Sequence, residues 1–159
     1  MNYFELFDIP VSLSINKALL SKQYFALQKK YHPDFFTHAT EAEQEAALET
    51  SSQVNKAYKT FNNPDATIKY VLQLKGVLEE EEKYQLPPDF LMEVMELNEE
   101  LSDDSAQQVK AFEAAIYATV KDDIEQYNDS TVTPQQLQAI KEYYFKKKYL
   151  QRILDRLAD

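Results

Sequence analysis

The residues best suited to chemistry are His32, Pro33 and Asp34, which follow one another in the chain. An imidazole can donate or accept a hydrogen bond or carry a positive charge, proline fixes the backbone φ angle, and aspartate can accept bonds from nearby backbone amides. No serine or cysteine lies close to His32 in the sequence, so a nucleophile would have to come from a distant part of the chain. The triplet therefore predicts a rigid turn that displays a histidine, and the alternative is a plain helix-ending turn.

The composition excludes most cofactor and metal sites. Gly76 is the only glycine, whereas a Rossmann turn or a P-loop needs several glycines to bring the backbone close to phosphate. The absence of cysteine removes disulfides, thiolate nucleophiles and metal centres held by sulfur. Two histidines, His32 and His38, leave little for an imidazole metal site. We expect no catalytic residues, no cofactor and no metal.

The charge of the chain limits its partners. The 159 residues carry 17 basic and 27 acidic side chains, a net charge of 17 − 27 = −10, which opposes binding along nucleic acid. No apolar run reaches the roughly 20 residues that span a bilayer. The first five residues show no basic leader or apolar export segment. We expect a cytoplasmic protein without a nucleic-acid or membrane partner.

Apolar residues recur at helical spacing through the first half of the chain. Two such stripes consist of Leu20, Tyr24, Leu27 and Tyr31, and of Val54, Ala57, Tyr58 and Phe61. Because proline disrupts a helix interior, the first helix is predicted to end near Tyr31, and the two stripes predict an antiparallel hairpin with His32 at its tip. Asn63-Pro64 begins a third helix that should stop at Gly76.

The second half of the chain is also predicted to be helical. Four successive glutamates, residues 79–82, indicate a linker or a solvated rim because like charges repel. Prolines at 87, 88 and 134 help to delimit three helices, at about 89–101, 105–127 and 134–157. The sequence thus predicts an all-α protein with a domain at 1–76, a linker at 77–87 and a three-helix bundle at 88–159.

Charge is distributed unevenly along the chain. Residues 9–33 contain no acid but four lysines, Lys17, Lys22, Lys29 and Lys30. Residues 79–104 contain eleven acids and one base. A cationic helix on an anionic protein favours a partner with an acidic face, because complementary potentials steer encounter. The alternative is that the lysines only solvate an outward face.

Two helices of the second half carry large side chains outside their core stripes. In the helix that follows Pro88, the core stripe is Phe90, Val94, Leu97 and Leu101, and the other side carries Leu91, Met92, Met95, Glu96 and Glu99. In the last helix, the core stripe is Ile140, Tyr143, Leu150, Leu154 and Leu157, and the opposite face carries Phe145, Tyr149, Arg152 and Arg156. Aromatic and arginine side chains are enriched at interface hot spots. These faces indicate protein docking, with burial against the first half of the chain or homodimerisation as alternatives.

Residues 1 to about 75 resemble a J domain. The resemblance rests on Tyr3-Phe4-Glu5-Leu6-Phe7, the basic helix, His32-Pro33-Asp34, and Val54-Asn55-Lys56-Ala57-Tyr58. J domains stimulate ATP hydrolysis by a DnaK-class chaperone through this turn and the basic face of the preceding helix. The resemblance assigns chaperone binding to His32, Pro33, Asp34, Lys22, Lys29 and Lys30. Phe35 departs from the family, because many J domains carry lysine there.

The whole chain resembles the HscB-type co-chaperones of iron–sulfur cluster assembly. The segment Phe90-Leu91-Met92-Glu93-x-Met95-Glu96-Leu97-x-Glu99-Glu100-Leu101 carries this resemblance in the second half. The family fold is an N-terminal J domain set against a C-terminal three-helix bundle that binds the cluster scaffold protein IscU. The resemblance assigns scaffold binding to Leu91, Met92, Met95, Glu96, Glu99, Lys148, Tyr149 and Arg152.

The resemblance implies an adaptor without catalytic activity of its own. It would bind an IscU-type scaffold, deliver it to an HscA- or DnaK-type chaperone and activate the ATPase of that chaperone. One alternative is a J-domain co-chaperone with a different client. Another is a structural helical protein or a helical enzyme.

Overall fold

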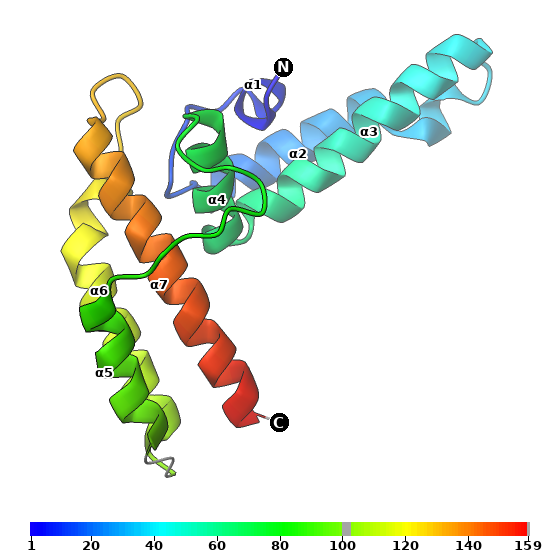
Figure 1. Cartoon of the computed structure of the whole chain (residues 1–159). Helices are drawn as coiled ribbons and strands as arrows, with labels where there is room; N and C mark the ends of the chain where they lie inside the picture. The colour runs from blue at the N-terminus through cyan, green and yellow to red at the C-terminus, as the bar shows by residue number, and fades with distance from the viewer. Residues whose placement is uncertain (100–102, 159) are drawn as a thin grey trace. The chain divides into compact units, whose positions relative to one another are not determined.

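A computed structural model describes residues 1–99 and 103–158, and within these ranges the regular structure is entirely helical. This confirms the predicted all-α class. The chain forms two compact units, one covering Met1–Val71 and one beginning at Leu72. Figure 1 shows the helices α2 and α3 side by side in the first unit and α6 alongside α7 in the second.

A short helix that the sequence analysis did not predict opens the first unit. Helix α1 (Tyr3–Phe7) begins with a capping box in which the Asn2 side chain accepts a bond from the Glu5 amide at 2.8 Å. Its five residues place the rings of Phe4 and Phe7 4.8 Å and 5.6 Å from the ring of Phe61. Five residues are too few for a stable helix alone, so burial of these rings is what stabilises α1.

The predicted hairpin is formed by α2 (Lys17–Tyr31) and α3 (Glu41–Phe61) (Figure 1). Leu20 and Val54 are fully buried between them. The ring of Tyr24 stacks on that of Tyr58 at 3.9 Å, and its hydroxyl lies 3.1 Å from Asn55 Oδ1. Helix α2 ends at Tyr31 as predicted, and a short 3₁₀ helix, η1 (Pro33–Phe36), follows at the tip of the hairpin.

The third predicted helix is also confirmed, as α4 (Pro64–Leu74). Asn63 caps it by accepting a bond from the Ala66 amide at 3.0 Å. Gly76 adopts a left-handed conformation with φ of 75°, and bonds from Gly76 and Val77 back to the carbonyls of Gln73 and Leu72 close the helix end. This pattern is a Schellman motif, for which glycine is the favoured residue.

The second unit contains α5 (Pro88–Glu99), α6 (Ser105–Glu125) and α7 (Pro134–Ala158), close to the predicted bounds. Their shared core cluster consists of Phe90, Val94, Val109, Leu150 and Ile153. The predicted core position Leu101 lies outside the described residues. At the end of α7, Leu154 and Leu157 of the predicted core stripe are half-buried and pack against this cluster, and Ile153, which the predicted stripe did not include, is buried within it.

The hairpin depends on Phe61, which is 2% exposed and contacts the rings of Tyr3, Phe4 and Phe7 in α1. We expect Phe61→Ala to lower the free energy of unfolding of the first unit by about 3 kcal/mol or more, since it removes a fully buried ring. Hydrogen exchange of the α2 and α3 amides measures this unit separately. Phe35→Ala, at a position 68% exposed, is the control and should change the value by no more than about 0.5 kcal/mol. Equal effects of the two substitutions would contradict the core role of Phe61.

Candidate partner-binding surfaces

The turn at His32 is held by bonds on both of its sides. The His32 amide closes α2 by donating to the Gln28 carbonyl at 2.9 Å, and its backbone is extended, as expected of a residue before proline. On the other side, the Asp34 amide donates to Nδ1 of the His32 ring at 3.2 Å, which caps η1. Because Nδ1 accepts this bond, the neutral ring carries its proton on Nε2. The imidazole is half exposed and the Asp34 carboxylate is almost fully exposed.

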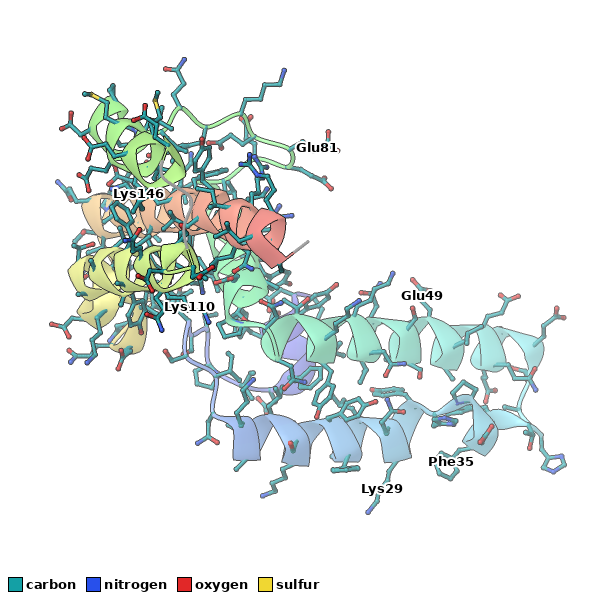
Figure 2. The ribbon with its side chains drawn as sticks, turned by 90° about the horizontal axis from the view of Figure 1, so that it is seen from below. Lys29, Phe35, Glu49, Glu81, Lys110 and Lys146 are labelled. Atoms are coloured by element: carbon teal, nitrogen blue, oxygen red, sulfur yellow. The ribbon has the colours of Figure 1, made fainter. Side chains whose placement is uncertain are left out.

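The three predicted chaperone-binding lysines are all exposed on α2. Lys22 and Lys29 are seven residues apart, which is about two helical turns, so they share one face. Figure 2 shows Lys29 pointing away from α3, while Glu49 points outward from α3 on the other side of the hairpin. Lys30 is turned about 100° from Lys29, and its ammonium lies 5.3 Å from the centre of the Tyr31 ring. The structure thus brings a cationic helix face and the His32 turn onto one hairpin.

Two exposed aromatic residues on this hairpin were missed as site candidates. Phe25 is 66% exposed and lies between Lys22 and Lys29 on the same helix face. Phe35 in η1 lies with its ring 6.3 Å from that of His32. The spacing of Phe25 from the two lysines, three and four residues, was a signal that could have found it. The candidate docking face is therefore apolar as well as cationic.

The α5 face carries most of the residues predicted to bind a scaffold protein. Met92 is 64% exposed and Met95 57%, and Glu96 and Glu99 are exposed beside them. Leu91 differs, because it is half-buried and packs against the core cluster. It lies about 100° from Phe90 around the helix, so it borders the core stripe instead of opposing it. The expectation that Leu91 faces outward with the methionines is wrong.

On α7, the predicted outward stripe is only partly exposed. Arg152 and Lys148 are exposed, whereas Tyr149 is half-buried with its ring 6.1 Å from that of Phe90. Phe145 does not face solvent freely, because the ring of Tyr84 stacks on it at 4.5 Å and almost parallel. The prediction of an open aromatic stripe is therefore wrong at Phe145.

The segment 77–87, here called the strap, covers Phe145 and is anchored to α7. Lys141 Nζ lies 2.7 Å from Glu82 Oε2 and donates to the Val77 carbonyl at 2.8 Å. The hydrogen bond from Lys141 holds the pKa of Glu82 below its ordinary value. Glu79, Glu80 and Glu81 are exposed, as the prediction of a solvated run requires, and Glu81 points away from the helices in Figure 2. Glu82 is the exception, because it forms an ion pair.

The strap and α7 enclose a surface pocket of about 350 Å³. Three residues predicted to bind a scaffold, Lys148, Tyr149 and Arg152, line it together with Lys83 and Tyr84 of the strap. The predicted residues of α5 do not line it. The predicted set therefore lies on two surfaces of the second unit, an acidic methionine face and this pocket.

Within residues 1–99 and 103–158, no group of three histidine or acidic side chains is placed to hold a metal ion. No helix in the same ranges is long and apolar enough to cross a membrane.

Comparison with known proteins connects the chain to a family. The family described as "HSCB C-terminal oligomerisation domain" matches residues 86–158. The co-chaperone protein HscB homolog of Vibrio vulnificus (strain YJ016) is 35% identical over 154 residues, which cover 91% of this chain and 90% of the relative. The chain belongs to the HscB family of co-chaperones. A homolog from Vibrio cholerae (serotype O1, strain O395) is 44% identical over 102 residues, and there the match spans about 60% of the relative's length.

Solved HscB structures share the fold. HscB from Vibrio cholerae superposes with a TM-score of 0.64 at 32% identity, covering 99% of both chains. Human HscB superposes with a TM-score of 0.79 at 29% identity, covering 99% of this chain and 81% of the human one. HscB proteins have an N-terminal J domain and a C-terminal helical domain, so the predicted fold and the resemblance are both confirmed.

The ion pair of the strap predicts a pH-dependent stability for this HscB chain. We expect Glu82→Gln to destabilise the second unit by about 1 kcal/mol at neutral pH, because it removes a partly buried, charge-assisted hydrogen bond. The pKa of Glu82 is lowered in the folded state, so its contribution is complete above the unfolded value of 4.5 and is lost as pH falls through the folded value. Thermal unfolding across this range should therefore show the difference from wild type disappearing in acid.

Glu80→Gln is the matched control for this experiment, since Glu80 is an exposed residue of the same strap. It should leave the unfolding temperature nearly unchanged at every pH. A Glu82→Gln effect of the same size above and below the titration would show that the loss does not come from the ion pair.

Proposed function

We propose that this chain is an adaptor of iron–sulfur cluster assembly with no catalytic activity of its own. Its second unit binds an IscU-type scaffold protein, and its J domain engages an HscA- or DnaK-type chaperone and stimulates the ATPase of that chaperone. The observation that carries the proposal is the His32-Pro33-Asp34 turn, with its half-exposed imidazole and exposed carboxylate, at the tip of a hairpin with a cationic face in a chain of the HscB family.

On the chaperone side, the lysines of α2 and the His32 turn have different roles in recognition. Lys22 and Lys29 supply positive potential along α2, which would steer an acidic partner surface to the hairpin. The Nε2 proton of His32 and the Asp34 carboxylate then offer one donor and one acceptor at a fixed place. If the turn binds one nucleotide state of the chaperone more tightly than the other, its binding shifts the chaperone toward the favoured state. Binding at the turn would promote ATP hydrolysis in this way.

On the scaffold side, α5 offers an adaptable apolar contact within an acidic surround. Met92 and Met95 have flexible thioether side chains that suit an exposed contact surface. Glu96 and Glu99, which are exposed beside them, favour a partner with basic residues around an apolar centre. Lys148, Tyr149 and Arg152 add a second contact on α7.

Carrying both surfaces on one chain has a thermodynamic consequence. Once the scaffold is bound to the second unit, its encounter with a chaperone bound to the first becomes intramolecular, and its effective concentration rises. Scaffold and adaptor added together should therefore stimulate steady-state ATP hydrolysis by the chaperone well beyond either alone. Stimulation by the adaptor with no further effect of scaffold would favour a J-domain protein with a different client.

The turn itself is tested by His32→Gln. We expect the stimulation of chaperone ATPase to fall at least about tenfold, because glutamine cannot reproduce the ring that bonds the Asp34 amide and presents a donor from its other side. Scaffold affinity, measured by calorimetry, should not change. His38→Gln, at an exposed histidine six residues further on, is the control and should keep full stimulation. Unchanged ATPase rates with His32→Gln would end the co-chaperone proposal.

The α5 face is tested by the double substitution Met92→Ala and Met95→Ala. We expect scaffold affinity to fall about tenfold, the effect of losing about 1.4 kcal/mol of apolar contact, with stimulation by the adaptor alone retained. Leu48→Ala removes a comparably exposed apolar side chain from α3 and should leave the affinity unchanged. If the methionine variant bound scaffold normally, the client would have to bind elsewhere.

A further inference from the structure

The pocket between the strap and α7 concentrates positive charge on an acidic protein. Lys83, Lys148 and Arg152 all line it and are exposed. Among residues 1–99 and 103–158, no carboxylate forms an ion pair with any of the three. The one acid in the lining, Glu82, is already paired with Lys141 at 2.7 Å. The pocket therefore offers three uncompensated cations on a chain whose net charge is −10.

The walls of the pocket are fixed before any partner arrives. The Tyr84 ring stacks on Phe145 at 4.5 Å with an angle of 4° between the ring planes, and Lys141 lies 5.7 Å from the centre of the Tyr84 ring. Tyr149 is braced against the core by its edge contact with Phe90. Aromatic walls that are already ordered reduce the entropy lost on binding, so the pocket has the properties of a preorganised contact site.

The chemistry of the lining favours a carboxylate. A guanidinium can bind a carboxylate with two parallel hydrogen bonds, and the two ammonium groups add charge without fixed geometry. A long polyanion would be repelled by the net negative charge of the chain, whereas a single acidic side chain interacts mainly with the nearby cations. The pocket is thus suited to an Asp or Glu side chain carried by a protein.

We propose that this pocket receives an acidic side chain of the scaffold protein, with Lys83 of the strap as a contact residue that the family resemblance does not assign. The inference rests on the proposed function. Because α5 is acidic and the pocket is basic, the second unit presents opposite charges on two of its surfaces. A partner that carries the complementary pair of charges binds in one orientation, and the reversed orientation places like charges together.

The test is calorimetric titration of the full-length adaptor with purified scaffold. We expect Lys83→Glu with Lys148→Glu to weaken binding at least tenfold and to make the affinity less dependent on salt, since fewer attractive charges remain to be screened. Lys110→Glu with Lys121→Glu makes the same charge change on α6, outside the pocket, and should alter the affinity by less than about threefold. Figure 2 labels Lys110 on this helix.

The outcomes separate this inference from the proposed function. Normal binding by the pocket variant, together with weakened binding by the Met92→Ala and Met95→Ala variant, would overturn the inference and leave the adaptor function standing. Failure of the wild-type protein to bind scaffold would overturn both. If inorganic phosphate shifted the amide resonances of the pocket but did not displace scaffold at matched ionic strength, the pocket would be a site for small free anions and the inference would be wrong.

Discussion

The first unit depends on the inability of a helix to pass through Pro33. Proline lacks the amide that would continue α2, and it restricts the preceding residue to extended backbone, so the chain must turn at His32. The turn then recruits the His32 ring as a cap for η1, which fixes the tautomer and leaves Nε2 as the donor. The position of the displayed ring therefore follows from Pro33, and its tautomer follows from the bond that the Asp34 amide donates. The aromatic contacts around Phe61 and the Tyr24–Tyr58 stack hold the two helices that carry it.

In the second unit, Lys141 is the residue on which the position of the strap depends. Its ammonium group binds Glu82 and the Val77 carbonyl, and it lies against the face of Tyr84, so one side chain fixes three points of the strap. The strap in turn covers Phe145 and forms a wall of the basic pocket. Because the strap is anchored to α7, its Glu82 is paired with Lys141, while its Lys83 stays exposed at the pocket. A segment that is acidic in sequence therefore contributes positive charge to this surface.

The parts of the fold that could be predicted are those fixed by local constraints. Pro33, Asn63-Pro64 and Gly76 mark helix ends because each acts on its own backbone, and the structure places helix ends beside them. Helix α1 could not be found this way, because it is too short to be stable without the burial of Phe4 and Phe7 against a residue far along the chain. The same holds for the strap, since neither Glu82 nor Tyr84 indicates in the sequence that its partner is on α7.

The candidate surfaces show the same division between local pattern and tertiary contact. Helical spacing located the exposed Met92 and Met95 correctly, but it misplaced Leu91, which borders the core stripe, and Phe145, which another segment covers. Periodicity gives the direction in which a side chain leaves its helix and carries no information about what lies over it. Residues of the strap were therefore absent from the predicted site, although Lys83 and Tyr84 share a pocket with three of its members.

In the proposed function, the placement of charge would let one acidic chain distinguish two partners. The cationic face of α2 and the acidic methionine face of α5 favour surfaces of opposite sign, so a partner suited to one is repelled by the other. This discrimination needs little favourable binding energy from the charged side chains themselves. An exposed pair of opposite charges contributes less than about 1 kcal/mol, whereas bringing like charges together is costly. In such contacts, affinity would come from the apolar side chains that binding covers, the methionines and the aromatic rings, and the charges would decide which protein reaches them.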